Sequence, residues 1–131
     1  ALGLSTFVSA GDHLLVADTV YGATRRFCEE VLKRYDVSVE YFDPLMGGDI
    51  VSLFTSRTRA IFMESPGSQT FEVMDVLAIT AQARPRGIVT LIDNTWATPL
   101  LFRPLEHGVD VSIQSATKYL SGHSDVMLGT L

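Results

Sequence analysis

Hydrophobic and polar positions along the chain predict strands and helices in alternation. The expected strands are short runs that are either apolar throughout or alternate with a period of two. They cover residues 13–18, 37–42, 60–65, 87–93 and 110–114. Helical patterns cover residues 22–35, 47–55, 72–84 and 104–108, and the residues before Gly11 read as the end of another helix.

This alternation predicts the fold class. Short strands that are apolar on both faces, joined by helices, form a parallel sheet through right-handed crossovers that place helices on both sides. We therefore expect an α/β protein with a three-layer α/β/α architecture and a mostly parallel sheet. Its functional residues should lie beyond the carboxyl ends of the strands, where loops converge on a ligand.

Composition narrows the class further. A chain of 131 residues that is 47% hydrophobic and 19% charged suits one compact globular domain. The net charge of −5, without a basic cluster, makes nucleic acid and anionic membranes poor partners. No apolar run approaches the roughly eighteen residues that span a bilayer, and no signal peptide is recognisable, so we expect a cytoplasmic protein. The single cysteine, Cys28, lies in a helical pattern and is expected to be a buried structural thiol.

Polar and aromatic residues follow the expected strands where each strand ends. Tyr21 comes shortly after the first strand, Glu64-Ser65 end the third, Asp93 ends the fourth, and residues 115–118 follow the last. Because the carboxyl ends of parallel strands meet at one edge of the sheet, we expect these residues to gather there.

A carboxylate such as Asp93, at the end of an apolar strand, is costly to bury without a cation or a strong donor. Lys118 is one possible partner, in a structural ion pair. A protonated pyridine nitrogen is another, and pyridoxal phosphate supplies one. This cofactor also needs an amine for a Schiff base, hydroxyls for its phosphate and a flat side chain for its ring, which Lys118, Ser115 with Thr117, and Tyr21 offer. From the residues alone, both interpretations stay open.

Other candidate sites carry less weight. The segment "GHSD" contains His123, Ser124 and Asp125, but adjacent residues in an extended segment project to opposite faces, so no catalytic triad is expected. His13 and His107 read as residues of helix ends or loops. No Cys/His spacing supports zinc, and we expect no metal site.

Three segments carry a resemblance to a known family. In this order, "GDHLLVADTVYG", "LIDNTWATPL" and "SATKYLSGHSDVMLGT" resemble the Cys/Met-metabolism family of pyridoxal-phosphate enzymes, and the resemblance covers essentially the whole chain. Within the family, "ESPGS" and the tryptophan of "IDNTWA" are most similar to bacterial cystathionine beta-lyases, because the γ-acting relatives usually carry asparagine at the position of Ser68 and phenylalanine at that of Trp96. The resemblance implies a fold-type I large domain, of which residues 1–131 would form a part, without an N-terminal segment and a C-terminal domain.

The resemblance also implies roles for individual residues. Lys118 would hold the cofactor as a Schiff base and then move the proton from the substrate Cα. Asp93 would keep the ring nitrogen protonated, and Tyr21 would stack on the ring. Ser115 and Thr117 would bind the phosphate, and Thr95 would pack against the opposite ring face. Ser68 is also expected among the cofactor contacts.

The activity that the resemblance implies is carbon–sulfur β-elimination. Cystathionine, a small sulfur amino acid, would give homocysteine, pyruvate and ammonia in methionine biosynthesis, and the protein would be a homo-oligomer, a dimer or a tetramer. A γ-acting enzyme, that is a cystathionine γ-lyase, a γ-synthase or a methionine γ-lyase, is the main alternative, and a non-catalytic α/β module is another. We expect little or no lyase activity from the isolated 131-residue chain, because further phosphate contacts and the arginine for the substrate carboxylate would lie outside it.

Overall fold

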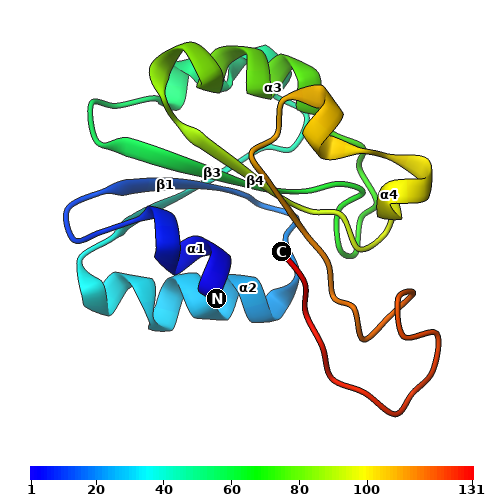
Figure 1. Ribbon diagram of the computed structural model, residues 1–131. Coiled ribbons are helices and arrows are strands. Elements are labelled where there is room, and N and C mark those ends of the chain that lie inside the picture. Colours follow the sequence, from blue (N-terminus) through cyan, green and yellow to red (C-terminus); the bar gives the residue numbers. More distant parts are fainter.

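The protein folds around one parallel β-sheet with helices on both faces (Figure 1). The computed structural model describes residues 1–131. The strands are β1 (His13–Ala17), β2 (Ser38–Phe42), β3 (Thr58–Glu64), β4 (Val89–Asp93) and β5 (Val111–Ile113), and their order across the five-stranded sheet is β2-β1-β3-β4-β5. Every pair of neighbouring strands is parallel. The expected α/β class and three-layer arrangement are confirmed.

The helices divide between the two faces of the sheet. The helices α1 (Leu2–Phe7) and α2 (Gly22–Glu30) lie on one face, and α3 (Val76–Ala83) lies on the other (Figure 1). A further short helix, α4 (Thr98–Leu101), follows β4. The remaining helical turns are 3₁₀ helices at Leu32–Tyr35, Gly47–Leu53, Arg84–Arg86 and Pro104–His107.

The position of each strand in the sheet explains its residue pattern. Every residue of β1 is buried, because this strand has neighbours on both edges and lies under helices. The edge strand β2 instead alternates between more and less exposed residues. A continuous apolar run therefore marks an inner strand of this parallel sheet, and an alternating run marks its edge.

The helix expected at residues 72–84 begins later than its periodicity predicts. It starts at Val76, and the side chain of Asp75 caps it by accepting a hydrogen bond from the amide of Ala78 at 2.9 Å. The residues before it turn back toward the end of β3, where the amide of Met74 donates to Ser65 Oγ at 3.0 Å. The Asp75 cap and the hydrogen bond from Met74 to Ser65 replace a first helical turn that the apolar spacing alone favours.

Two other expected helices differ from the structure. The helix expected over residues 22–35 stops at Glu30 and continues as the 3₁₀ helix Leu32–Tyr35. The first helix ends at Phe7, so Gly11, at a φ of 85°, belongs to the turn before β1 and does not cap the helix directly. The short helix α4 matches none of the expected elements, because its four residues are too few to show a period.

Cys28 lies on the buried side of α2. Its side chain is fully enclosed, and burial raises the pKa of the thiol to about 11. The expected buried structural thiol is confirmed. None of the helices has both the length and the apolar character needed to cross a bilayer.

Candidate active site

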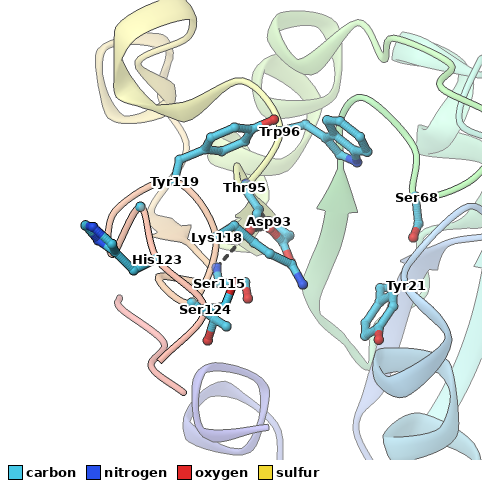
Figure 2. A pocket seen from close by; sticks show the side chains of 12 residues that line it. Tyr21, Ser68, Asp93, Thr95, Trp96, Ser115, Lys118, Tyr119, His123 and Ser124 are labelled. Atoms are coloured by element: carbon cyan, nitrogen blue, oxygen red, sulfur yellow. Dashed lines mark hydrogen bonds between the residues drawn. The ribbon is translucent and has the colours of Figure 1, made fainter. Parts of the chain in front are cut away.

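The carboxyl ends of the strands meet beside a cavity of about 690 Å³. This volume lies within the range of roughly 300–1,000 Å³ that small-molecule sites occupy. Figure 2 shows side chains from several loops converging on it. The cavity lining includes all of the expected site residues: Tyr21, Ser68, Asp93, Thr95, Ser115, Thr117 and Lys118.

Asp93 ends β4 with one carboxylate oxygen bound and the other free. Its Oδ1 accepts hydrogen bonds from the amide of Thr95, at 2.9 Å, and from the Thr95 hydroxyl. That hydroxyl in turn accepts from the amide of Ser115 at 2.8 Å, which ties the end of β4 to the segment after β5 (Figure 2). Asp93 Oδ2 makes no hydrogen bond, so it can accept one from a ligand.

Lys118 offers an unpaired amine to the same cavity. Its residue is exposed, and Figure 2 shows the side chain extending into the cavity in the direction of Tyr21. The Nζ atom takes part in none of the ion pairs within 4.0 Å in the structure. The alternative of a structural ion pair between Lys118 and Asp93 is therefore not what the structure shows.

The two hydroxyls expected to bind phosphate differ in their surroundings. The Ser115 side chain makes no hydrogen bond, although its amide does. The Thr117 hydroxyl donates to the carbonyl of Leu128 at 3.2 Å and accepts from the amide of Leu128 at 2.9 Å. A hydroxyl has only one proton to donate, so Ser115 is ready to donate to an anion and Thr117 must first release Leu128.

Tyr21 lies at the start of α2 beside the cavity, and 58% of the residue's surface is exposed. Its backbone amide donates to Glu64 Oε2 at 2.8 Å. Glu64 is buried at the end of β3, directly beside Asp93 on β4. Burial, with a further contribution from the charge of Asp93, raises the pKa of the Glu64 carboxyl to about 7, although the Tyr21 hydrogen bond favours its charged form.

Glu64 is the site residue to which the sequence assigned no role. It shares with Asp93 the signal that pointed to the site, an acid at the end of an apolar strand. Its hydrogen bond to Tyr21 joins residues 43 positions apart, so no local pattern predicts it.

Aromatic and small residues complete the cavity wall. Trp96 meets the ring of Phe71 edge-on, with ring centroids 5.2 Å apart. The cavity lining outside the expected residues consists of Trp96, Tyr119, Gly122, His123 and Ser124. His123 Nδ1 pairs with the carbonyl of Ser121 at 2.9 Å, and no hydrogen bond joins its ring to the side chain of Ser124 or Asp125, so "GHSD" forms no triad.

These groups fit pyridoxal phosphate in kind. Its aldehyde requires an unpaired amine, and its ring nitrogen requires a free carboxylate oxygen. Its phosphate requires a free hydroxyl, and its ring face requires a flat side chain such as an exposed phenol ring. No group of three or more His, Cys, Asp and Glu side chains is arranged to hold a metal ion.

Comparisons with known proteins agree with this chemistry. The family model described as Cys/Met metabolism PLP-dependent enzyme matches residues 1–131. The cystathionine beta-lyase MetC of Escherichia coli is 49% identical over 133 residues, which cover 99% of this chain and 33% of that protein. An L-alanine/L-glutamate racemase of Wolbachia pipientis is 46% identical over 126 residues, which cover 96% of this chain and 31% of that protein.

The fold comparison gives the same result. The crystal structure of a cystathionine gamma-lyase from Lactobacillus plantarum, complexed with L-serine, superposes with a TM-score of 0.92 at 38% identity, over 97% of this chain and 33% of that one. The chain thus spans about a third of the length of the relatives it matches. The resemblance inferred from the sequence motifs is confirmed, and the chain belongs to the Cys/Met-metabolism family of pyridoxal-phosphate-dependent enzymes.

Proposed function

We propose that the protein containing this chain is a pyridoxal-phosphate-dependent carbon–sulfur β-lyase that cleaves cystathionine. The observation that carries the proposal is that one cavity is lined both by Lys118, whose amine is unbound, and by Asp93, which has a free carboxylate oxygen. The β-lyase assignment rests on the 49% identity to a cystathionine beta-lyase, together with Ser68 and Trp96 in the cavity wall.

Each group has a role in holding and using the cofactor. Pyridoxal phosphate, when bound, supplies a ring that accepts the electron pair left on the substrate Cα. Lys118 would hold the cofactor through its amine and would be the base for the Cα proton. Asp93 Oδ2 would accept a hydrogen bond from the protonated ring nitrogen, and Tyr21 would cover one face of the ring.

The remaining residues orient the cofactor. Ser115 would donate a hydrogen bond from its free hydroxyl to the phosphate, and Thr117 would do so after giving up its bond to Leu128. Thr95 would lie against the other ring face, and its hydroxyl links Asp93 to the amide of Ser115. Ser68 contributes a further polar contact, since its amide is already bound to the carbonyl of Thr19 at 2.8 Å and its side chain is free.

The reaction balances without another reagent except water. The proton leaves Cα, the bond from Cβ to sulfur breaks, and the thiolate takes up a proton to become homocysteine. The remaining three-carbon amino acid hydrolyses to pyruvate and ammonia. Lys118 is the group placed to move the proton at Cα.

The test is product analysis with the whole gene product. Cystathionine should yield pyruvate, and Lys118→Ala should lose both this activity and the visible absorption band of lysine-bound cofactor. Formation of 2-oxobutyrate in place of pyruvate would establish the γ-acting alternative. Equal spectra for the wild type and Lys118→Ala would refute the site itself.

A second candidate is amino-acid racemisation, favoured by the 46% identity to the Wolbachia racemase. Both reactions begin with removal of the Cα proton, and they differ in whether a group leaves Cβ or the proton returns to the opposite face. Incubation with L-alanine separates them, because a racemase produces D-alanine and a β-lyase does not.

We also propose that residues 1–131 form part of a larger cofactor-binding domain in a cytoplasmic homo-oligomer. The larger domain is supported by the length of the relatives, because this chain covers only about a third of each. Large apolar side chains left exposed, with 90% of Leu100 and 93% of Met127 accessible, require cover from the rest of the protein or from a partner subunit. Light scattering on the whole protein measures the oligomeric state, and a monomer would contradict it.

A further inference from the structure

Glu64 is a buried acid without a cationic partner. It ends β3, in the interior of the sheet between β1 and β4, and only 5% of its surface is exposed. No Lys, Arg or His nitrogen lies within 4.0 Å of its carboxyl. Burying a carboxyl in this way costs free energy unless the group makes compensating hydrogen bonds. The contact that Glu64 does make is therefore informative.

That contact fixes the start of α2. Glu64 Oε2 accepts the hydrogen bond of the Tyr21 amide at 2.8 Å. Tyr21 is the residue before the first helical turn, and its carbonyl accepts from the amides of Thr24 and Arg25 at 2.9 and 3.1 Å. The Glu64 side chain thus holds the backbone from which the Tyr21 ring projects beside the cavity (Figure 2).

The same acid is the direct neighbour of Asp93. The two residues are paired in register across β3 and β4. Glu64 therefore connects the strand that presents the carboxylate of Asp93 with the loop that presents the ring of Tyr21. A ligand ring bound between these two groups would have its position set from both sides.

Resting on the proposed function, we propose that Glu64 is a positioning residue for the cofactor ring. Its carboxyl oxygen holds the Tyr21 backbone at a fixed place relative to Asp93, and so sets the gap between the stacking phenol and the acceptor of the ring nitrogen. Glu64 acts through Tyr21 and does not itself touch the cofactor.

Side-chain length should decide the outcome of substitution. Glu64→Gln keeps both the length and an acceptor oxygen. Glu64→Asp keeps the carboxyl group but is one methylene shorter, and Glu64→Ala removes the acceptor. In the whole protein, the Ala and Asp variants should raise the dissociation constant for pyridoxal phosphate about tenfold. The Gln variant and the control Glu30→Gln, on the exposed side of α2, should stay within about twofold of wild type. Titration with pyridoxal phosphate, followed by the absorption band, measures this.

A second readout needs no cofactor. Exchange of the Tyr21 amide hydrogen should be slow in the wild type and in Glu64→Gln, and faster in the other two variants. If Glu64→Ala and Glu64→Asp do not fold, the wild type and the Gln variant still suffice. In the wild type the Tyr21 amide resonance should shift as Glu64 titrates, and this shift should disappear in the Gln variant, which retains Asp93 and Lys118.

The outcomes separate this inference from the proposed function. Three results would each overturn the positioning role. The first is equal cofactor affinity in all folded variants, and the second is a loss of affinity in Glu64→Gln as large as in Glu64→Ala. The third is a Tyr21 amide resonance that does not respond to the titration of Glu64. A wild-type protein that forms no cofactor band would overturn the proposed function, and the amide measurements would then still test the contact between Glu64 and Tyr21.

Discussion

Two neighbouring acids at one sheet edge have different surroundings. Asp93 receives two hydrogen bonds from Thr95 on one oxygen. Glu64 is more deeply buried and receives the single bond from Tyr21. Hydrogen bonds to a carboxylate favour its charged form and burial disfavours it, so the balance at Glu64 lies toward the protonated acid.

This balance predicts a dependence of stability on pH. The Glu64 pKa is about 7 in the folded state and 4.5 in its ordinary setting, so between these values the folded protein binds more protons than the unfolded one. The stability that this difference contributes is fully present below pH 4.5 and is lost as the pH rises through about 7. The loss amounts to about 3 kcal/mol.

Denaturant unfolding of the whole protein at pH 5 and at pH 7.5 measures the effect. Glu64→Gln should reduce the difference between the two values by about 2 kcal/mol, the part of this loss that falls between pH 5 and pH 7.5, because the amide cannot ionise. If the unfolding free energies of the wild type and of Glu64→Gln change equally between the two pH values, Glu64 does not titrate as proposed.

At the scale of elements, the position of the loop after β3 depends on a close contact between Gly67 and Thr19. A Cβ atom at Gly67 would lie 2.9 Å from the Cβ and Oγ1 atoms of Thr19, and this distance is too short for any packed pair. The amide of the next residue, Ser68, donates to the carbonyl of Thr19 at 2.8 Å. The absence of a side chain at Gly67 thus lets this loop lie close to the segment after β1 and places Ser68 at the cavity.

Gly67→Ala should therefore destabilise the protein by about 1–3 kcal/mol, because either the loop or Thr19 must move. Gly22→Ala is the matched control, since a Cβ there meets nothing within 4 Å and φ is not positive. The control should change the unfolding free energy by less than about 0.5 kcal/mol. Equal unfolding midpoints for the two variants would contradict the close approach.

The elements also show which features of the fold the residue patterns predict. The inner strands were predictable because burial on both faces makes them apolar throughout. The first turn expected for α3 was wrong, because the amide of Met74 donates to Ser65 at the end of β3 and the helix begins only after Asp75. Apolar spacing describes only the side that faces the core, and it cannot reveal such backbone partners.

At the scale of the whole molecule, the chain presents only part of what a lyase needs. The cavity lining contains no arginine, and of the two expected phosphate hydroxyls only that of Ser115 is free. We predict that the isolated 131-residue chain forms little or no pyruvate from cystathionine, whereas the whole gene product forms it. Pyruvate production by the isolated chain at a rate close to that of the whole protein would refute this.

The sequence by itself determined the α/β class, the family and the group of residues that gathers around the cavity. The spacing of apolar residues and the ends of the strands are local properties of the sequence, and each family motif is a contiguous segment. All three can therefore be recognised along the chain. Only the tertiary structure decided which hydroxyl is free, since Thr117 pairs with Leu128, and that Glu64 holds the Tyr21 amide. These contacts join residues 11 and 43 positions apart in the chain, and they depend on strand register and loop packing, which no single segment encodes.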